Sequence, residues 1–110
     1  MERFVKGDIV VLPFPYTNSS TTKKRPALVI ATLRGQNIIL AQITTVQRED
    51  EDLINLTKSD FSSGFLKHDS FIMCSIITTA ESSTVSYKVG KLKMEKIKQV
   101  QERLCEIFTR

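Results

Sequence analysis

Apolar residues through most of the chain occur in short runs that are separated by turn residues. Runs of this length, rich in Val and Ile and bounded by Gly, Pro and polar residues, are typical of β-strands. Short strands joined by turns predict a small barrel or sandwich. We expect strands over residues 8–12, 27–32, 38–45, 53–56, 71–79 and 84–89, the last of them at an edge of the sheet.

The C-terminal segment has a different period. Between residues 94 and 108, apolar side chains occur at spacings of three and four: Met94, Ile97, Val100, Leu104 and Ile107 or Phe108. This spacing predicts one amphipathic helix that packs on the sheet. We interpret its apolar stripe as core, because a small barrel needs a lid, and the sequence leaves open whether part of the stripe is a dimer surface.

A polar segment separates the first two predicted strands. Residues 17–22 are all small and polar, with Pro13 and Pro15 before them and the sequence Lys-Lys-Arg-Pro at residues 23–26 after them. Because proline cannot donate to a central ladder, these prolines are expected to bound a loop that is longer than a hairpin requires. Long loops on small rigid domains are often functional.

Composition narrows the class of protein. The chain has 110 residues, of which 41% are hydrophobic and 25% charged, as expected for one globular domain over residues 1–110. No apolar stretch approaches the roughly 18 residues of a membrane helix, and residues 1–4 lack the apolar core of a signal peptide. We therefore expect a cytoplasmic protein that does not associate with membranes.

The distribution of charge is more informative than the net charge of +4. Basic residues before residue 37 and after residue 71 flank an acidic middle that contains the run Glu-Asp-Glu-Asp at residues 49–52. This asymmetry permits an anionic partner, although a solvated surface explains it equally well.

The residues that hold metals or act as nucleophiles are few. Cys74, Cys105 and His68 have no zinc-binding spacing, so neither a metal nor another cofactor is expected. Both cysteines are interpreted as small core residues. With a single histidine, the chain also lacks the residues of a Ser-His-Asp hydrolase site.

Five segments, in this order, resemble the motifs of the MazF/PemK toxin family. They are residues 7–17 (GDIVVLPFPYT), 24–30 (KRPALVI), 39–44 (ILAQIT), 64–72 (GFLKHDSFI) and 90–92 (GKL). Each motif alone is weak, whereas together they extend over nearly the whole chain.

The resemblance implies an SH3-like antiparallel barrel of the MazF/CcdB type, mainly β, that forms a homodimer. It also implies the toxin of a type II toxin–antitoxin system: a metal-independent endoribonuclease for single-stranded mRNA. A MazE-like acidic antitoxin would inhibit it, and contact with DNA would be only through that antitoxin. The alternatives are a CcdB-like gyrase-inhibiting toxin and a barrel that binds RNA or antitoxin without catalysis.

Metal-free cleavage of RNA uses the 2′-OH of the substrate as the nucleophile, so the protein must supply proton transfer and stabilise the phosphorane charge. The resemblance assigns catalysis to Arg25, in the Arg-Pro pair, and to Thr44, at the end of the third predicted strand. From the residues alone, a solvated arginine explains Arg25 as well, and a β-forming threonine explains Thr44 better. Arg34 and Arg48 are expected to lie outside the site.

Other candidates follow from the same resemblance and from residue chemistry. Lysines position phosphates, aromatic rings stack on unpaired bases, and a carboxylate or imidazole transfers protons. The predicted RNA-binding residues are Tyr16, Asn18, Ser19, Ser20, Lys23, Lys24, Phe65 and Thr79, and the candidate acid or base is Glu81 or His68.

The sequence departs from better-known members at one place. Ile76 and Thr78 occupy positions where many members have Gln and Arg, while Thr79 agrees and Glu81 stands in for an Asp. In some members that Arg and Asp transfer the protons. The identity of the base, the cleavage sequence and catalytic activity itself are therefore open at this point.

Overall fold

The computed structural model describes residues 3–15 and 22–110, which form a β-sheet, two short 3-10 helices and one α-helix. The expectation of a mainly β protein with a C-terminal helix is confirmed. The elements are β1 (Asp8–Pro15), β2 (Thr22–Thr32), β3 (Asn37–Thr44), β4 (Leu53–Leu56), η1 (Lys58–Asp60), β5 (Phe61–Gly64), β6 (Ser70–Glu81), η2 (Ser82–Thr84), β7 (Tyr87–Leu92) and α1 (Met94–Thr109).

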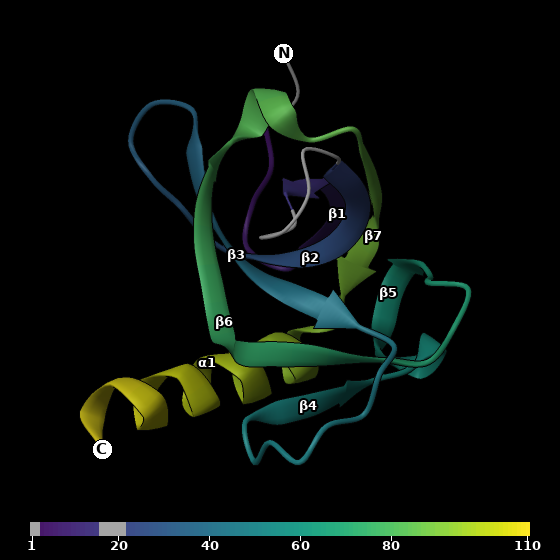
Figure 1. Ribbon diagram of the computed structural model, residues 1–110, viewed down its shortest axis with the longest axis vertical. Helices are drawn as coiled ribbons and strands as arrows, with labels where there is room; N and C mark the ends of the chain where they lie inside the picture. The colour runs from purple at the N-terminus through teal and green to yellow at the C-terminus, as the bar shows by residue number, and fades with distance from the viewer. Residues whose placement is uncertain (1–2, 16–21) are drawn as a thin grey trace.

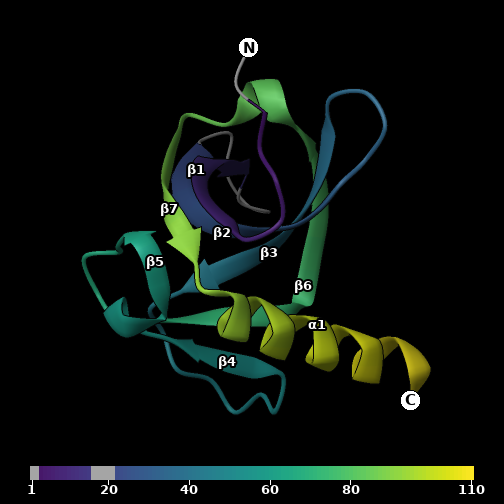
Figure 2. The ribbon, with the colours of Figure 1, turned by 180° about the vertical axis from the view of Figure 1, so that it is seen from behind.

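The strands form one antiparallel sheet in the order β4-β6-β3-β2-β1-β7-β5. The sheet curls into an open half-barrel, and α1 runs across one side of it (Figures 1 and 2). β6 contains a bulge, because Ala41 pairs with Ile77 and the next residue, Gln42, pairs with Met73. The strand bends along its length (Figure 1). Because of this bend, β6 pairs with β3 along its length and with β4 over its first four residues.

Both faces of the sheet are buried, which explains the continuous apolar run in β2. Leu28 packs in a cluster with Ile97 and Leu104 of α1, whereas Val29 belongs to a second cluster with Phe4. Successive side chains of a strand point to opposite faces, so each face of β2 needs its own apolar residues.

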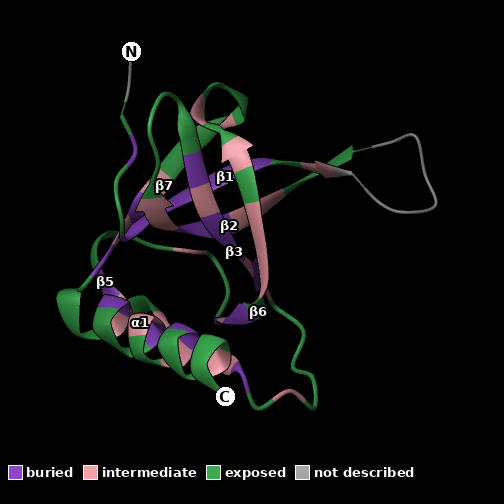
Figure 3. Cartoon of the chain, turned by 90° about the vertical axis from the view of Figure 1, so that its left-hand side faces the viewer, coloured by how far each residue is buried: buried purple, intermediate pink, exposed green. Residues whose placement is uncertain are grey.

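Residues 13–15 and 22–26, which were predicted as part of a loop or its boundaries, are strand, because β1 and β2 continue as a two-stranded arm. Pro13 and Pro15 pair with β2, beyond Val11, where the pairing of β1 with β7 ends. Pro26 likewise lies just before Ala27, where β2 begins to pair with β3. Each proline therefore has a neighbouring strand on one side only, which is where a strand tolerates proline. The arm projects from the body (Figure 3).

Two strands differ from their predicted positions. β5 was missed because Phe61 is its only large apolar residue; the strand pairs closely with β7, and a Cβ on Gly64 would lie 2.1 Å from the carbonyl oxygen of Val89. The strand expected at residues 84–89 begins at Tyr87 instead and lies between β1 and β5, so it is not an edge.

The acidic run at residues 49–52 is bound by the C-terminal helix. Asp52 is buried, and its Oδ1 accepts a hydrogen bond of 2.7 Å from Nη2 of Arg110. Arg103 donates to the backbone carbonyl of Glu51. The helix also buries Val100 against the sheet, as predicted, whereas Met94 and Phe108 are exposed. Part of the predicted apolar stripe therefore faces solvent.

The two cysteines have opposite environments. Cys74 is fully buried in β6, as expected, but Cys105 is exposed on α1, so its interpretation as a core residue is wrong. Burial raises the pKa of the Cys74 thiol to about 11. The thiolate is the reactive form, so near pH 8 both shielding and protonation protect Cys74.

We expect a thiol reagent at pH 8 to label the native protein rapidly at one position. The fast reaction should disappear in Cys105→Ser and persist in Cys74→Ala, and Cys74 should react only after denaturation. Two fast thiols in the native protein, counted by mass spectrometry, would contradict the burial of Cys74.

Candidate functional site

A hollow of about 300 Å³ lies where the arm meets the end of β3. It brings together Arg25 and Thr44, the two residues predicted to be catalytic. The described residues that line it are Phe14, Arg25, Gln42, Ile43, Thr44, Val46, Arg48 and Met73.

The strand register explains why Arg25 and Thr44 meet. The last pair between β2 and β3 is Ala27 with Gln42, and Arg25 and Thr44 each lie two residues beyond that pair. Side chains two residues apart on a strand share a face, so Arg25 and Thr44 extend the face of Ala27 and Gln42. Both are half-buried, and the body of the sheet therefore supports them at the edge of the hollow.

Local contacts orient both side chains. Arg25 pairs with the buried Leu12 across the arm, and Pro26 restricts its backbone to extended conformations. The Oγ1 atom of Thr44 accepts a hydrogen bond of 3.1 Å from the backbone N–H of Val46. That bond uses an acceptor position of the hydroxyl and leaves its O–H to donate. The hollow thus combines a permanently charged guanidinium with a neutral hydroxyl donor.

Arg48 lines the same hollow, so its expected position outside the site is wrong. Arg48 lies four residues beyond the end of β3. The path of this segment beside the hollow cannot be predicted from the local sequence. Arg34 lies in the turn between β2 and β3, at the other end of β3 from Thr44, and is not among the lining residues.

Alternation along β2 separates the neighbouring basic residues. Lys23 pairs with Phe14 and lies on the face of Arg25, whereas Lys24 pairs with Pro13 on the opposite face. Lys24 lines a second hollow, together with Phe65. The predicted RNA-binding residues Lys24 and Phe65 are therefore brought together, but away from Arg25.

The remaining candidates in the described part of the chain do not reach the Arg25 hollow within one copy. Glu81 pairs with Asn37, at the end of β3 opposite to Thr44, and Thr79 pairs with Ile39. His68 is exposed between β5 and β6. Tyr16, Asn18, Ser19 and Ser20 lie outside the described residues.

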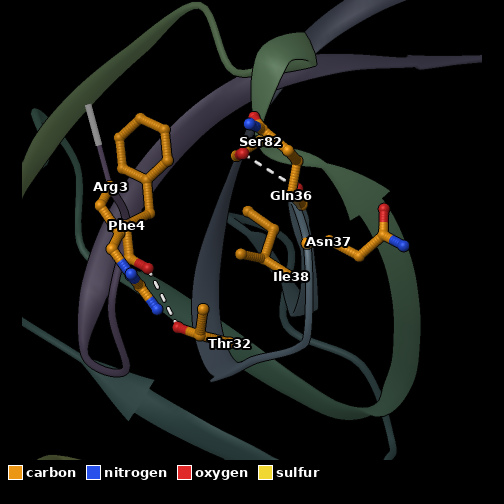
Figure 4. A pocket seen from close by; sticks show the side chains of 8 residues that line it. Arg3, Phe4, Thr32, Gln36, Asn37, Ile38 and Ser82 are labelled. Carbon is orange, nitrogen blue, oxygen red and sulfur yellow. Dashed lines mark hydrogen bonds between the residues drawn. The ribbon is translucent and has the colours of Figure 1, made fainter. Parts of the chain in front are cut away.

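A third hollow, of about 240 Å³, lies near Glu81, between the N-terminal segment and the turn before β3. In Figure 4 the hydroxyl of Thr32 donates to the carbonyl oxygen of Phe4, and the hydroxyl of Ser82 donates to that of Gln36. These bonds join β2 to the N-terminal segment and η2 to the turn before β3. The hollow contains neither Arg25 nor Thr44.

Over residues 3–15 and 22–110, no three His, Cys, Asp or Glu side chains are close enough to hold one metal ion. Within these ranges, no helix has the length and apolar character needed to cross a membrane.

Comparison with known proteins gives one family. Residues 5–108 match the model of the "PemK-like, MazF-like toxin of type II toxin-antitoxin system" family. Comparison with curated protein sequences gives no significant match.

Solved structures share the fold at low sequence identity. An endoribonuclease in complex with its cognate antitoxin, from a mycobacterial species, superimposes with a TM-score of 0.77 and 12% identity, covering 96% of this chain and 95% of the other. The Mycobacterium tuberculosis toxin MazF-mt6 gives a TM-score of 0.72 and 19% identity, covering 92% and 95% of the two chains.

Proposed function

The chain belongs to the PemK-like, MazF-like toxin family of type II toxin–antitoxin systems, and we propose that it is an endoribonuclease that cleaves single-stranded mRNA in the cytoplasm without a metal ion. The observation that supports this activity is the shared hollow of Arg25 and Thr44. Their two strands contribute a positive charge and a hydroxyl donor to the lining of the hollow, and in the proposed site an RNA phosphate would bind between these two groups.

In the proposed reaction, the 2′-oxygen of the substrate attacks the adjacent phosphorus and the bond to the 5′-oxygen breaks. The products are a 2′,3′-cyclic phosphate and a 5′-OH. The phosphorane formed on the way carries extra negative charge on its non-bridging oxygens. The planar guanidinium of Arg25 can donate to two of these oxygens, and the Thr44 hydroxyl can donate one further bond.

The proton acceptor for the 2′-OH is not among the described lining residues, none of which is a carboxylate or a histidine. Glu81 and His68 remain the proposed acid and base. Because both lie away from the hollow of their own copy, each would act there only from the second copy of a homodimer. A dimer of this kind is therefore part of the proposal.

We also propose an acidic antitoxin as the inhibiting partner, with DNA reached only through it. The support is the cognate antitoxin bound to the endoribonuclease of the same fold. The exposed lysines of the arm, Lys23 and Lys24, offer positive charge to such a partner.

Purified protein should cleave single-stranded RNA in the presence of excess EDTA, leave 5′-OH ends and spare DNA. The reason is that the 2′-OH is the nucleophile and Arg25 supplies the positive charge. End-labelling of the products identifies the ends. A requirement for magnesium, or cleavage at a 2′-deoxy position, would contradict the mechanism. Gyrase inhibition without RNA cleavage, or RNA binding without cleavage, would instead favour one of the two alternative functions.

Replacing Arg25 should remove transition-state stabilisation while leaving the fold intact. Loss of one such donor costs roughly 10²–10³ in rate, and we expect at least this for Arg25→Ala in single-turnover cleavage. Arg25→Lys should not restore activity, because lysine lacks the planar fork. Thr44→Ala should also slow cleavage.

Arg34→Ala is the matched control, because it removes the same charge outside the hollow and should change the rate little. Arg48→Ala should weaken RNA binding more than it slows the chemical step. Thermal melts of each variant separate catalytic loss from unfolding. An Arg25→Ala protein within tenfold of wild type would place catalysis elsewhere.

The homodimer is tested by sedimentation at micromolar concentration. We expect a species of twice the chain mass of 12.5 kDa, since a dimer would supply the residues that each hollow lacks. A 12.5 kDa species in fully active protein would contradict a site shared between two copies.

A further inference from the structure

The second hollow, of about 500 Å³, lies between the arm, β7 and the segment after β5, and it shares no residue with the Arg25 hollow. Its described lining residues are Val11, Lys24, Pro26, Phe65, Leu66, Lys67, Tyr87, Lys88 and Val89. They include two aromatic rings and three lysines, and none of them is acidic.

The two aromatic side chains face solvent rather than the core. Phe65 and Tyr87 are each 55% exposed, although they come from different parts of the chain. The ammonium group of Lys58 lies 5.0 Å from the centre of the Phe65 ring. Exposed rings beside positive charge are the combination that binds single-stranded nucleic acid, because bases stack on the rings and phosphates pair with the cations.

The lysines differ in how far their charge is already neutralised. Nζ of Lys88 lies 3.2 Å from Oδ1 of the buried Asp8. Lys24 and Lys67 are exposed, and neither forms an ion pair within the described part of the chain. Lys24 and Lys67 are therefore the residues with charge available for an anionic ligand.

We infer that this hollow binds a segment of single-stranded RNA outside the cleaved linkage, with bases on Phe65 and Tyr87 and phosphates on Lys24 and Lys67. The inference rests on the proposed function, since it locates a further part of the same substrate. Lys24 and Arg25 are adjacent on β2 and point to opposite faces of the arm. One strand thus contributes a basic residue to each hollow, and RNA that crosses the arm contacts both.

An acidic peptide would also pair with the lysines. The two exposed rings favour RNA, because every base has a flat face that can stack on a ring. An acidic peptide is accordingly an outcome that the experiment must distinguish.

Binding is measured with an uncleavable 2′-O-methyl RNA of twelve nucleotides, labelled with fluorescein and followed by anisotropy. Phe65→Leu and Tyr87→Leu keep apolar bulk but remove the rings, and each should raise Kd about tenfold. Lys67→Ala should reduce the slope of log K against log salt by about 0.7. Phe108→Leu and Lys98→Ala, exposed on α1, are matched controls that should leave Kd unchanged.

A second readout reports on the hollow directly. The chain has two tyrosines and no tryptophan, so in Tyr16→Phe the only tyrosine emission comes from Tyr87. Stacking of a base on Tyr87 should quench this emission as RNA is added. The readout does not depend on cleavage.

The outcomes separate this inference from the proposed function. Ring-dependent RNA binding without cleavage supports the hollow and contradicts the nuclease. Cleavage with no change of Kd in Phe65→Leu and Tyr87→Leu overturns the hollow and leaves the nuclease intact. Ring-dependent binding of a glutamate-rich peptide, with none of the RNA, also overturns the inference and assigns the hollow to a protein partner.

Discussion

The register of β2 against β1 and β3 determines which side chains can act together. Arg25 of β2 pairs with Leu12 of β1. It lies two residues beyond Ala27, the last residue of β2 that pairs with β3, where its partner is Gln42. A slip of one residue would turn Arg25 to the opposite face of the arm and bring Lys24 to the face of Thr44. Both faces of β2 are buried within the body, by Leu28 on one side and Val29 on the other, so such a slip would exchange the side chains of the two core clusters and disrupt the packing of both. The core thus holds the candidate site in register.

The strand register also determines which side chains lie on each face of the arm, outside the core of the sheet. β1 does not pair with β7 after Val11, and β2 does not pair with β3 before Ala27. Beyond these residues, β1 and β2 pair only with each other and form the arm. On this arm the alternation that buries apolar residues in the body distributes basic residues between two faces. The charges of the acidic run stabilise the fold, because Arg103 of α1 and Arg110, the residue that follows the helix, donate hydrogen bonds to this run. These bonds attach the C-terminal end of α1 to the segment before β4.

Regular patterns made the strands and the helix predictable, and irregular ones did not. β4 was predicted with its observed bounds and α1 to within one residue, because their apolar spacing reflects burial. β5 carries one apolar residue and depends on a close approach of backbones at Gly64, which no periodicity records.

Arg25 and Thr44 were identified from their resemblance to family motifs, whereas Arg48 was missed because its position depends on the path of a loop. Cys105 is exposed because of the rotation of α1 about its own axis. The packing of the helix on the sheet determines this rotation, so the local sequence does not reveal it.

In the proposed mechanism, Arg25 donates to the two non-bridging oxygens of the scissile phosphate. This contact is tested by replacing each of these oxygens in turn with sulfur, which accepts hydrogen bonds poorly, and comparing single-turnover cleavage by wild type and Arg25→Ala. We predict that sulfur at either position slows the wild-type enzyme, because Arg25 donates to both oxygens, and that Arg25→Ala loses most of this effect. An equal effect of sulfur on both proteins would show that Arg25 does not contact the reacting phosphate.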